Sequence, residues 1–437
     1  MFNFLFKRID NSPLIAFRIL FGLLMLFQVY ISLSSNWIPR AYTDPKFTFS
    51  HIGMEWLQPL QGNGMYWYYA IMGVFALLIT IGFKYRASLI IFGLMWAGTY
   101  YMQKTIYNNH HYLMILFCVI MLFLPANAYA SLDSRRNPAI RRYSMPYWCI
   151  GVIIAQMAIV YFFAAVAKLY PGWLDGTFTR IMLPKGGTHW YTRMLTQEWC
   201  SYLIAYAGIA FDLLIIPMLL YKRTRHIGAV ASLGFHLFNS ALLKIGIFPY
   251  LALALLVLFY PPEQIRRFFF WKKPPVVDDG SVIKSAKNNK LLLYFFVPYF
   301  IIQIALPVRH YFIPGDVMWT EEGHRLSWRM MLKFKTGKVD FSIVDRKTGD
   351  VYGYDLKNTL TPKQISSMST RPDMIWQMAQ YIKKEYAAKG RDVAIYANAM
   401  VSLNNSPRRP IIDTDADLTR VEWKHLTHNE WVLLNDE

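Results

Sequence analysis

Charged residues are scarce in this chain, which has 437 residues of which 17% are Asp, Glu, Lys or Arg. Soluble domains carry about 25% charged residues. The deficit, together with 55% hydrophobic residues, excludes an ordinary soluble domain and indicates a membrane protein. Acidic residues are the scarcer kind, 27 against 46 Lys and Arg, which gives a formal net charge of +19. Such a charge would normally suggest a nucleic-acid partner, so the positions of the basic residues matter.

Cysteine and the motifs of common soluble enzymes are also rare or missing. Cys118, Cys149 and Cys200 lie in or beside apolar segments and share no metal-ligand spacing. We interpret them as buried hydrophobic residues, and we predict neither a disulfide framework nor a metal site. The chain contains no P-loop, no dinucleotide glycine pattern, no G-x-S-x-G and no H-E-x-x-H. The enzyme classes that depend on those motifs are therefore not indicated.

Long apolar runs are what the sequence does contain. A bilayer crossing needs about 20 apolar residues, and a helix is the only open-ended element that satisfies its own backbone in lipid. We therefore predict a polytopic α-helical membrane protein with eight to nine transmembrane helices. The nine predicted segments are 13–34, 65–83, 87–103, 112–129, 146–167, 200–220, 226–243, 245–261 and 291–307.

The basic residues are distributed unequally between the two sides of these segments. With the N-terminus inside, the inner segments carry more than twice as many Lys and Arg as the outer ones, as the positive-inside rule requires. The first run starts near Pro13, follows Lys7 and Arg8, and lacks a small-x-small cleavage site, which predicts a signal anchor. The basic excess therefore sets topology and contacts anionic lipid, and we expect no nucleic-acid partner. We expect a cell (inner) membrane protein with a cytoplasmic N-terminus.

The composition changes after Pro307. Alternating patterns predict strands at 330–334, 339–345, 351–355, 393–403 and 418–423, and helical spacing predicts a helix over 362–388 that stops before Gly390. We therefore predict two domains. Residues 1–308 would form the transmembrane helical domain, and residues 309–437 a small, β-rich, extracytoplasmic α+β domain.

One lysine stands at the end of the fifth apolar run. Lys168 follows 146–167, and a cation at that depth is costly, so it usually has a partner or a function. An amine among apolar groups favours its neutral form because desolvation penalises charge, and a neutral lysine can act as a base. The alternative is a lysine that extends to the headgroups. Arg18 and Asp212 also lie within apolar segments and would pair with polar groups that the sequence does not identify.

Three further polar clusters could carry chemistry. Asn108, Asn109, His110 and His111 precede an apolar segment, where amides and imidazoles can hold a polar head or an oxyanion, although an ordinary polar loop is the alternative. His236 stands three residues before Asn239, on the same helix face. A satisfied core histidine is the alternative there. The third cluster is the polar stretch 321–331 at the start of the outer domain.

Six short segments match, in order, the motifs of one family. They are 17–25, the N-N-H-x-Y-L motif at 108–113, 161–173 with its lysine, 236–248, the S-W-x-M-M motif at 327–331, and 402–418. The chain therefore resembles the vitamin K-dependent gamma-glutamyl carboxylase family, including bacterial members built around the HTTM membrane domain. Each motif is weak alone, and the resemblance extends over nearly the whole chain.

The resemblance implies a reaction and its participants. A reduced vitamin K or menaquinone-type naphthoquinone and O2 would give the epoxide, and this oxidation would drive carboxylation of glutamate with CO2. The partners would be the lipid bilayer and a glutamate-containing peptide or protein. The implied catalytic residues are Lys168, as the initiating base, and His110. The implied quinone-binding residues are Asn109, His110 and His236, and the implied acceptor-binding residues are Trp328, Lys333, Lys335 and Arg371.

The sequence also departs from the family pattern. Animal members have two adjacent lysines at the base position, whereas here Ala167 precedes Lys168. The histidine and arginine that follow S-W-x-M-M in animal members correspond here to Lys333 and Lys335, which keep charge but not bidentate geometry. Two alternatives therefore stay open. The protein could be a quinol epoxidase or oxygenase that does not carboxylate glutamate, or a non-enzymatic membrane binding protein on the same scaffold.

Overall fold

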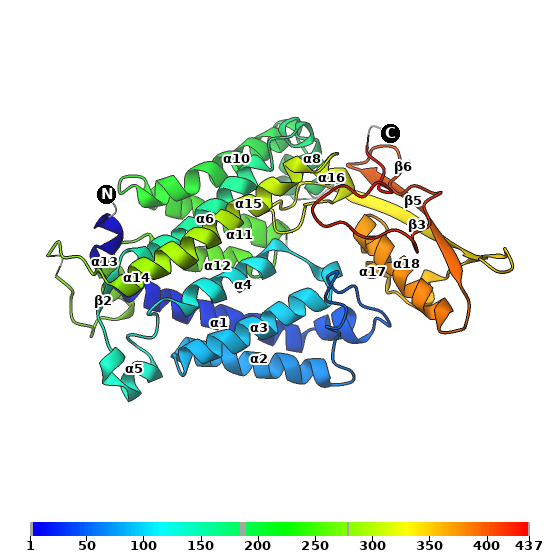
Figure 1. The fold of residues 1–437 in the computed structure, drawn as a ribbon. Helices are drawn as coiled ribbons and strands as arrows, with labels where there is room; N and C mark the ends of the chain where they lie inside the picture. The colour runs from blue at the N-terminus through cyan, green and yellow to red at the C-terminus, as the bar shows by residue number, and fades with distance from the viewer. Residues whose placement is uncertain (1–2, 184–188, 244, 278, 436–437) are drawn as a thin grey trace.

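The computed structural model describes residues 3–183, 189–243, 245–277 and 279–435. A bundle of long helices forms one end of the molecule, and a small sheet covered by two helices forms the other (Figure 1). The N-terminus lies at the far end of the bundle from the sheet. The longer helices are α1 (Ser12–Ser34), α2 (Gly64–Ile81), α3 (Tyr85–Met102), α4 (Asn109–Leu122), α6 (Trp148–Val166), α10 (Glu198–Leu220), α11 (Arg225–Leu243), α12 (Phe248–Leu255), α13 (Pro262–Phe269) and α15 (Val297–Val308).

The predicted helical membrane architecture is confirmed, whereas the count of nine spans stays a prediction. Within the described residues, six helices are long and apolar enough to cross a membrane. The count becomes seven if 248–258 and 262–269, which meet at 113°, form one broken span. All nine predicted segments fall on helices, but α4 has only 14 residues. The last span runs continuously over 286–312, so the predicted domain boundary at 308 falls within its final turns.

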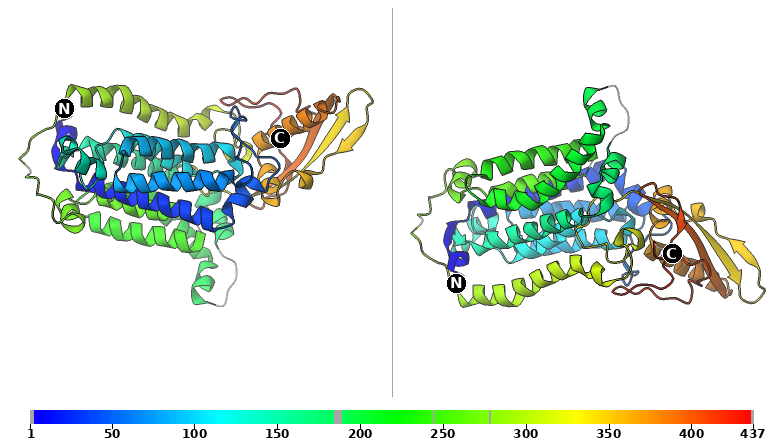
Figure 2. Two further views of the ribbon diagram at one scale, coloured as in Figure 1. Left: turned by 90° about the horizontal axis from the view of Figure 1, so that it is seen from below. Right: turned by 90° about the horizontal axis from the view of Figure 1, so that it is seen from above.

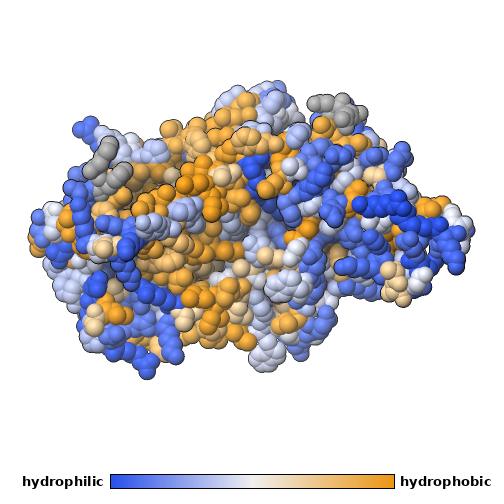
Figure 3. Space-filling view, in the orientation of Figure 1, coloured by the Kyte–Doolittle hydropathy of each residue, from blue (hydrophilic) through white to orange (hydrophobic). Residues whose placement is uncertain are grey.

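The outer surface of the bundle is suited to lipid. Figure 3 shows an apolar belt over the helices, with polar surface on the sheet domain and at the opposite end of the bundle. Its side chains include Leu94, Val230 and Ile301, which are 69%, 71% and 62% exposed. Apolar exposure of this extent marks a membrane or partner surface. Figure 2 shows α15 on one flank of the bundle and α10 and α11 on the opposite flank.

Arg18 illustrates how a charge is accommodated inside the bundle. Its side chain is fully buried, and its guanidinium donates hydrogen bonds to the carbonyl oxygens of Ala126 and Ala130, at 2.9 and 2.7 Å, and of Thr80 and Tyr129, at 3.2 and 3.4 Å. A guanidinium has five N–H donors in a fixed fork. It can therefore bond to several main-chain carbonyls at once. These hydrogen bonds tie α1 to the end of α2 and to the chain after α4.

The outer domain contains a four-stranded antiparallel sheet in the order β4-β3-β5-β6. The strands are β3 (Lys335–Asp345), β4 (Val351–Gly353), β5 (Val393–Leu403) and β6 (Arg409–Pro410). The helices α17 (Pro362–Met368) and α18 (Pro372–Ala387) cover one face. Alternate residues of β3, Val339, Phe341 and Ile343, are buried on that face because side chains alternate along a strand. The predicted α+β domain is thus present.

Two predicted strands are wrong. No strand forms at 330–334, and the chain before β3 is irregular, because Leu326, Trp328 and Met331 have φ values of 61°, 58° and 49°. Such left-handed residues cannot belong to an extended strand. The predicted strand at 418–423 instead lies along α18, whose Trp376 and Gln380 donate to its carbonyl oxygens.

A buried charge cluster fixes the outer domain on the bundle. Asp373, at the start of α18, accepts two hydrogen bonds from Arg325, at 2.8 and 3.2 Å, and pairs with Lys104 from the chain between α3 and α4. Burial alone would raise the pKa of Asp373, but Arg325 and Lys104 hold it well below its usual range. Burial lowers the pKa of Lys104 to about 8. The cluster joins three separate segments beside the candidate site.

Candidate functional site

Lys168 is buried and paired. It follows the last turn of α6, its residue is 8% exposed, and its Nζ forms an ion pair with the Asp212 carboxylate from α10. The Nζ also donates to the carbonyl oxygen of Ala164 at 3.2 Å and lies 5.3 Å from the centre of the Trp173 ring. The side chain therefore points between α6 and α10 and does not extend to the headgroups.

Lys168 and Asp212 line a cavity of about 570 Å³ between α6, α10 and α11. Most of its wall is apolar, and the aromatic part comes from Trp173, Phe211, Phe235, Phe238 and Phe248. The polar side chains on the wall are Lys168, Asp212, His110, Tyr161 and Asn239. A concave, mainly apolar site with a few convergent polar groups is typical of small-molecule binding. We call it the Lys168 cavity.

His110 reaches this cavity from the first turn of α4. The helix begins here because the Asn108 side chain accepts a hydrogen bond from the backbone N–H of His111 at 2.9 Å, which is an N-cap. The His110 ring stacks on Phe248, with 4.3 Å between ring centres. Neither of its ring nitrogens has a hydrogen-bond partner in the described part of the chain, so both are available to a ligand.

His236 lies behind the cavity wall and acts on it through Tyr161. It is fully buried on α11, and its Nε2 is 3.0 Å from the Tyr161 hydroxyl. Its Nδ1 is buried and finds no hydrogen-bond partner in the part of the chain that the structure describes. Tyr161 lines the cavity on the same helix that leads to Lys168, and Asn239 lines it one turn after His236. Of the predicted pair on α11, Asn239 therefore lines the cavity with Lys168, whereas His236 reaches it only through Tyr161.

Asn109 and Trp328 do not line the Lys168 cavity. The Asn109 amide accepts from the Tyr107 hydroxyl at 2.8 Å and donates to the carbonyl oxygen of Arg329 at 3.1 Å. Trp328 is 1% exposed and stacks on Tyr112, with 5.2 Å between ring centres. Both residues hold the segment 326–331 against α4. That segment reaches the cavity through Met330 and Met331.

The backbone of this segment is strained. Within it, Leu326, Trp328 and Met331 have positive φ values of 61°, 58° and 49°, and Glu321, shortly before the segment, has a φ of 65°. Each such residue costs of the order of 1 kcal/mol or more, and clusters of them occur at functional sites. The contacts of Asn109 and Trp328 with this segment explain how the strained conformation is kept.

Lys333, Lys335 and Arg371 form a separate basic cluster around Glu321. The Glu321 carboxylate is 2.8 Å from Lys333 Nζ and 3.6 Å from Lys335 Nζ. The two lysines also donate to the carbonyl oxygens of Met318 and Trp319, respectively, and the Arg371 guanidinium donates to the Ser367 carbonyl at 3.1 Å. We call Glu321, Lys333, Lys335 and Arg371 the Glu321 cluster. None of its members lines the Lys168 cavity.

Burial and mutual repulsion shift the titration of this cluster. Burial lowers the pKa of Lys335 to about 7, in spite of the nearby Glu321 carboxylate. Burial alone would raise the pKa of Glu321, but Lys333, His324 and Lys335 hold it below its usual range. With three cations around one carboxylate, the cluster is positive overall when Lys335 is protonated.

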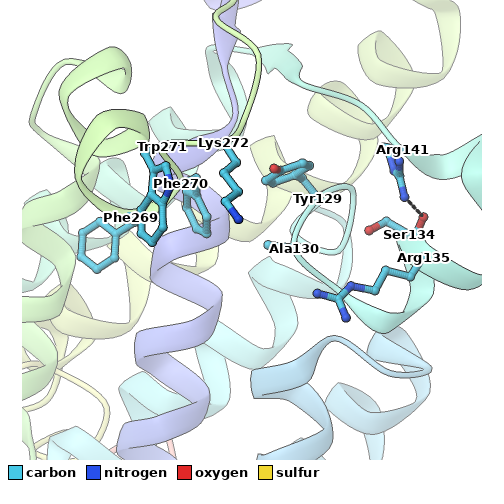
Figure 4. A pocket seen from close by; sticks show the side chains of 9 residues that line it. All are labelled: Tyr129, Ala130, Ser134, Arg135, Arg141, Phe269, Phe270, Trp271 and Lys272. Atoms are coloured by element: carbon cyan, nitrogen blue, oxygen red, sulfur yellow. Dashed lines mark hydrogen bonds between the residues drawn. The ribbon is translucent and has the colours of Figure 1, made fainter.

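Another cavity lies at the end of the bundle far from the sheet domain, near α5 (Leu132–Arg136) and α13. It has a volume of about 380 Å³, and its basic side chains are Arg135, Arg141 and Lys272. Figure 4 shows these among the aromatic rings of the wall, with Arg141 donating to the Ser134 carbonyl. None of the residues that line it is a sequence-predicted site residue.

Sequence reasoning left three contacts of the candidate site unassigned. Asp212 stands out in the sequence as an acid within an apolar segment, but only the packing of α6 against α10 identifies Lys168 as its partner. Tyr161 belongs to a quoted motif, and its role depends on the proximity of His236. No pattern in the sequence indicates that Glu321 pairs with Lys333 and Lys335.

Two family models together match most of the chain. The model described as HTTM domain matches residues 6–263. The model described as vitamin K-dependent gamma-carboxylase, lumenal domain, matches residues 288–437. No solved structure matches the chain. The first match contains Lys168, Asp212, His110 and His236, and the second contains the strained segment and the Glu321 cluster.

Proposed function

The chain belongs to the vitamin K-dependent gamma-carboxylase family, and from this premise we propose that it is a gamma-glutamyl carboxylase, an integral membrane enzyme of the carbon–carbon lyase class. It would couple epoxidation of a reduced naphthoquinone by O2 to carboxylation of a glutamate side chain with CO2. The observation that carries the proposal is the pairing of Lys168 with Asp212 on the wall of an apolar cavity that also presents His110.

The polarity of the Lys168 cavity wall suits a naphthoquinone. Its aromatic and aliphatic wall suits a flat apolar ring, and His110, Tyr161 and Asn239 could hydrogen-bond to ring oxygens. When bound, the reduced quinone with O2 supplies a base strong enough to remove the γ-hydrogen of glutamate, which no side-chain base achieves near its operating pKa. His236 would hold the Tyr161 hydroxyl in position.

Lys168 would accept a proton at Nζ to start the reaction. Transfer of a proton from Lys168 Nζ to the Asp212 carboxylate within the ion pair would free the Nζ lone pair without changing the net charge of the pair. Asp212 is therefore proposed as the group that takes this proton. Trp173 and the apolar wall would exclude water from the amine, which strengthens the interactions inside the cavity.

We propose that Asn109 contributes by holding the segment 326–331 beside the quinone, and that Trp328 shapes the same segment for the acceptor. Lys333, Lys335 and Arg371 would attract a glutamate-rich peptide or protein to the outer face, because their cluster is positive overall. The orientation proposed is an inner-membrane protein with its N-terminus in the cytoplasm. The acceptor would then be modified on the extracytoplasmic side.

A direct product assay tests the proposal. The purified full chain in lipid nanodiscs is supplied with reduced naphthoquinone, O2, labelled bicarbonate and a glutamate-rich peptide. Both quinone epoxide and labelled peptide are measured, with a glutamine-rich peptide as the control for the acceptor. The proposal predicts labelled peptide, together with epoxide, in the mixture with the glutamate peptide. It predicts no labelled peptide with the glutamine peptide, where any epoxide comes from turnover that does not need the acceptor. Product in neither channel would contradict it.

The second candidate is a quinol epoxidase that does not carboxylate glutamate. The observation that favours it is the Glu321 carboxylate, which already engages both lysines proposed for the acceptor. In the same assay this candidate predicts epoxide without label. Labelled peptide would exclude it.

A further inference from the structure

Another cavity, with a polar wall, lies at the C-terminal end of α6, next to the Lys168 cavity. It has a volume of about 490 Å³ and is lined by residues of the turn after α6, of the chain 310–317 and by Arg329. Its polar wall consists of Tyr170, His310, Tyr311, Asp316 and Arg329. Nothing in the mechanism above uses it. We call it the Arg329 cavity.

Arg329 is a buried cation with little compensation. Its residue is 9% exposed, and its one side-chain hydrogen bond within the described residues runs from Nη1 to His310 Nε2 at 3.1 Å. His310 Nδ1 is 2.8 Å from the Pro307 carbonyl oxygen. That contact requires a proton on Nδ1, so Nε2 is the acceptor and the ring is neutral, as assigned from the hydrogen-bond network. Arg329 Nε is buried and has no hydrogen-bond partner among the described residues.

Most other buried basic side chains of the described structure have more partners than Arg329, whereas buried Arg266 resembles it, with a single hydrogen bond to the Lys273 carbonyl oxygen. Lys104, Lys168 and Lys273 each pair with an aspartate, and Lys333 pairs with Glu321. Arg18 has carbonyl oxygens on several sides. Arg329 forms no ion pair with a carboxylate of the described residues. A buried charge without a counterion is unfavourable, so its retention beside a cavity indicates a ligand of opposite charge.

The neighbouring groups leave the guanidinium free for such a ligand. Asp316 also lines the cavity, and one oxygen of its carboxylate caps α16 (Val317–Thr320) by accepting from the Met318 N–H at 2.8 Å. Asp316 and Glu321 favour the charged form of Arg329 through space, but among the described residues neither forms an ion pair with it. The Tyr170 hydroxyl donates to the Leu332 carbonyl. Arg329 therefore supplies the strongest unused donors on this wall.

The Arg329 cavity is adjacent to the proposed reaction site. Ala167 lines it, while the next residue, Lys168, lines the Lys168 cavity. Likewise Arg329 lines it, while Met330 lines the Lys168 cavity. At both places, neighbouring residues of the chain line different cavities, so the two cavities lie on either side of the same stretches of backbone. The lysines implied by the family resemblance are already bound to Glu321.

We propose that the Arg329 cavity binds a carboxylate-class oxyanion next to the reaction site, in an inference that rests on the proposed function. The ligand is the side-chain carboxylate of the acceptor glutamate or the bicarbonate that is in equilibrium with CO2. Both are planar and present paired oxygens, which match the fork of a guanidinium better than a lysine ammonium does.

Binding without turnover tests this inference. Isothermal titration calorimetry is performed on the full chain in nanodiscs, without quinone, at constant ionic strength. The probes are N-acetyl-glutamic acid α-amide and bicarbonate, with uncharged N-acetyl-glutamine amide as the control ligand. The variants are Arg329→Gln, Lys333→Gln at the competing site and, as the matched control, Lys338→Gln on the exposed face of β3. We expect at least one charged probe to bind, with its Kd raised about tenfold or more in Arg329→Gln, raised less in Lys333→Gln and unchanged in Lys338→Gln.

The outcomes separate the possible sites and sources. Loss of binding in Arg329→Gln identifies the site, and the probe that binds identifies the source. Binding that survives Arg329→Gln, or that is lost only in Lys333→Gln, overturns the inference, as does wild-type protein that binds neither probe. Because the assay needs no product, these results are independent of whether carboxylation occurs.

A measurement on unaltered protein covers the case in which Arg329→Gln does not fold. A dicarbonyl reagent that modifies arginine is applied to wild-type protein, and labelling of Arg329 is followed by peptide mass spectrometry. The binding probe should slow labelling of Arg329 but not of exposed Arg180, which pairs with Glu198 at the surface. Equal labelling rates with and without the probe would overturn the inference.

Discussion

The ion pair between Lys168 and Asp212 makes a quantitative prediction about stability. Both side chains are buried, with 10% and 6% of their surfaces exposed. Removal of one partner of a buried pair leaves an uncompensated charge and costs about 3–5 kcal/mol, whereas replacement of both by apolar residues of similar size is nearly neutral or stabilising. Asp212→Asn and Lys168→Met should therefore each lower the free energy of unfolding by about 3–5 kcal/mol.

The double variant Lys168→Met with Asp212→Leu should recover most of that loss. The assay is the free energy of unfolding in mixed micelles, measured for the wild type, the single variants and the double variant as a cycle. A coupling energy of several kcal/mol is expected, since each single variant breaks the same contact. Single losses below about 1 kcal/mol, typical of exposed pairs, or losses that add in the double variant would refute the reasoning.

Three further predictions concern other parts of the site. Tyr161→Phe removes the hydrogen bond to His236 and should raise the KM for quinone several-fold, with a stability loss of only about 0.5–1.5 kcal/mol; an unchanged KM would contradict the proposed role. Asp373→Asn strands two cations and should cost about 3–5 kcal/mol of unfolding free energy. The exposed control Asp340→Asn should cost less than about 1 kcal/mol. Because burial lowers the pKa of Lys335 to about 7, its charge is present below that pH and lost above it. The KM for an acidic peptide should therefore rise across neutral pH, and Lys335→Arg should flatten the profile, whereas an identical profile in the variant would exclude this residue.

The sequence predicted the helical membrane architecture because apolar length is a local property. Each predicted segment falls on a helix. The family motifs also singled out His110 and Lys168 as site residues, and both line one cavity. The number of spans is less accessible, since α4 is short and the chain bends by 113° after 258. Hydropathy does not report such bends.

Contacts between distant segments were beyond sequence reasoning. Asp212 lies 44 residues from Lys168, and no local pattern links them. The strand predicted at 330–334 failed because tertiary contacts of Asn109 and Trp328 hold the preceding segment in left-handed conformations. Local strand propensity cannot anticipate such contacts, since context overrides it. The same holds for Arg329, whose lack of an ion pair with any described carboxylate is visible only once its neighbours are placed.

The central claim is that Lys168 is the base that starts quinone oxygenation. The most direct measurement is the rate of quinone epoxide formation by Lys168→Ala, compared with wild-type protein and with Lys338→Ala, which changes a lysine on the exposed face of β3. Thermal unfolding in nanodiscs confirms that each variant is folded. The account predicts that Lys168→Ala forms no epoxide above the background without enzyme, while Lys338→Ala matches the wild type. Epoxide formation at the wild-type rate by folded Lys168→Ala would contradict it.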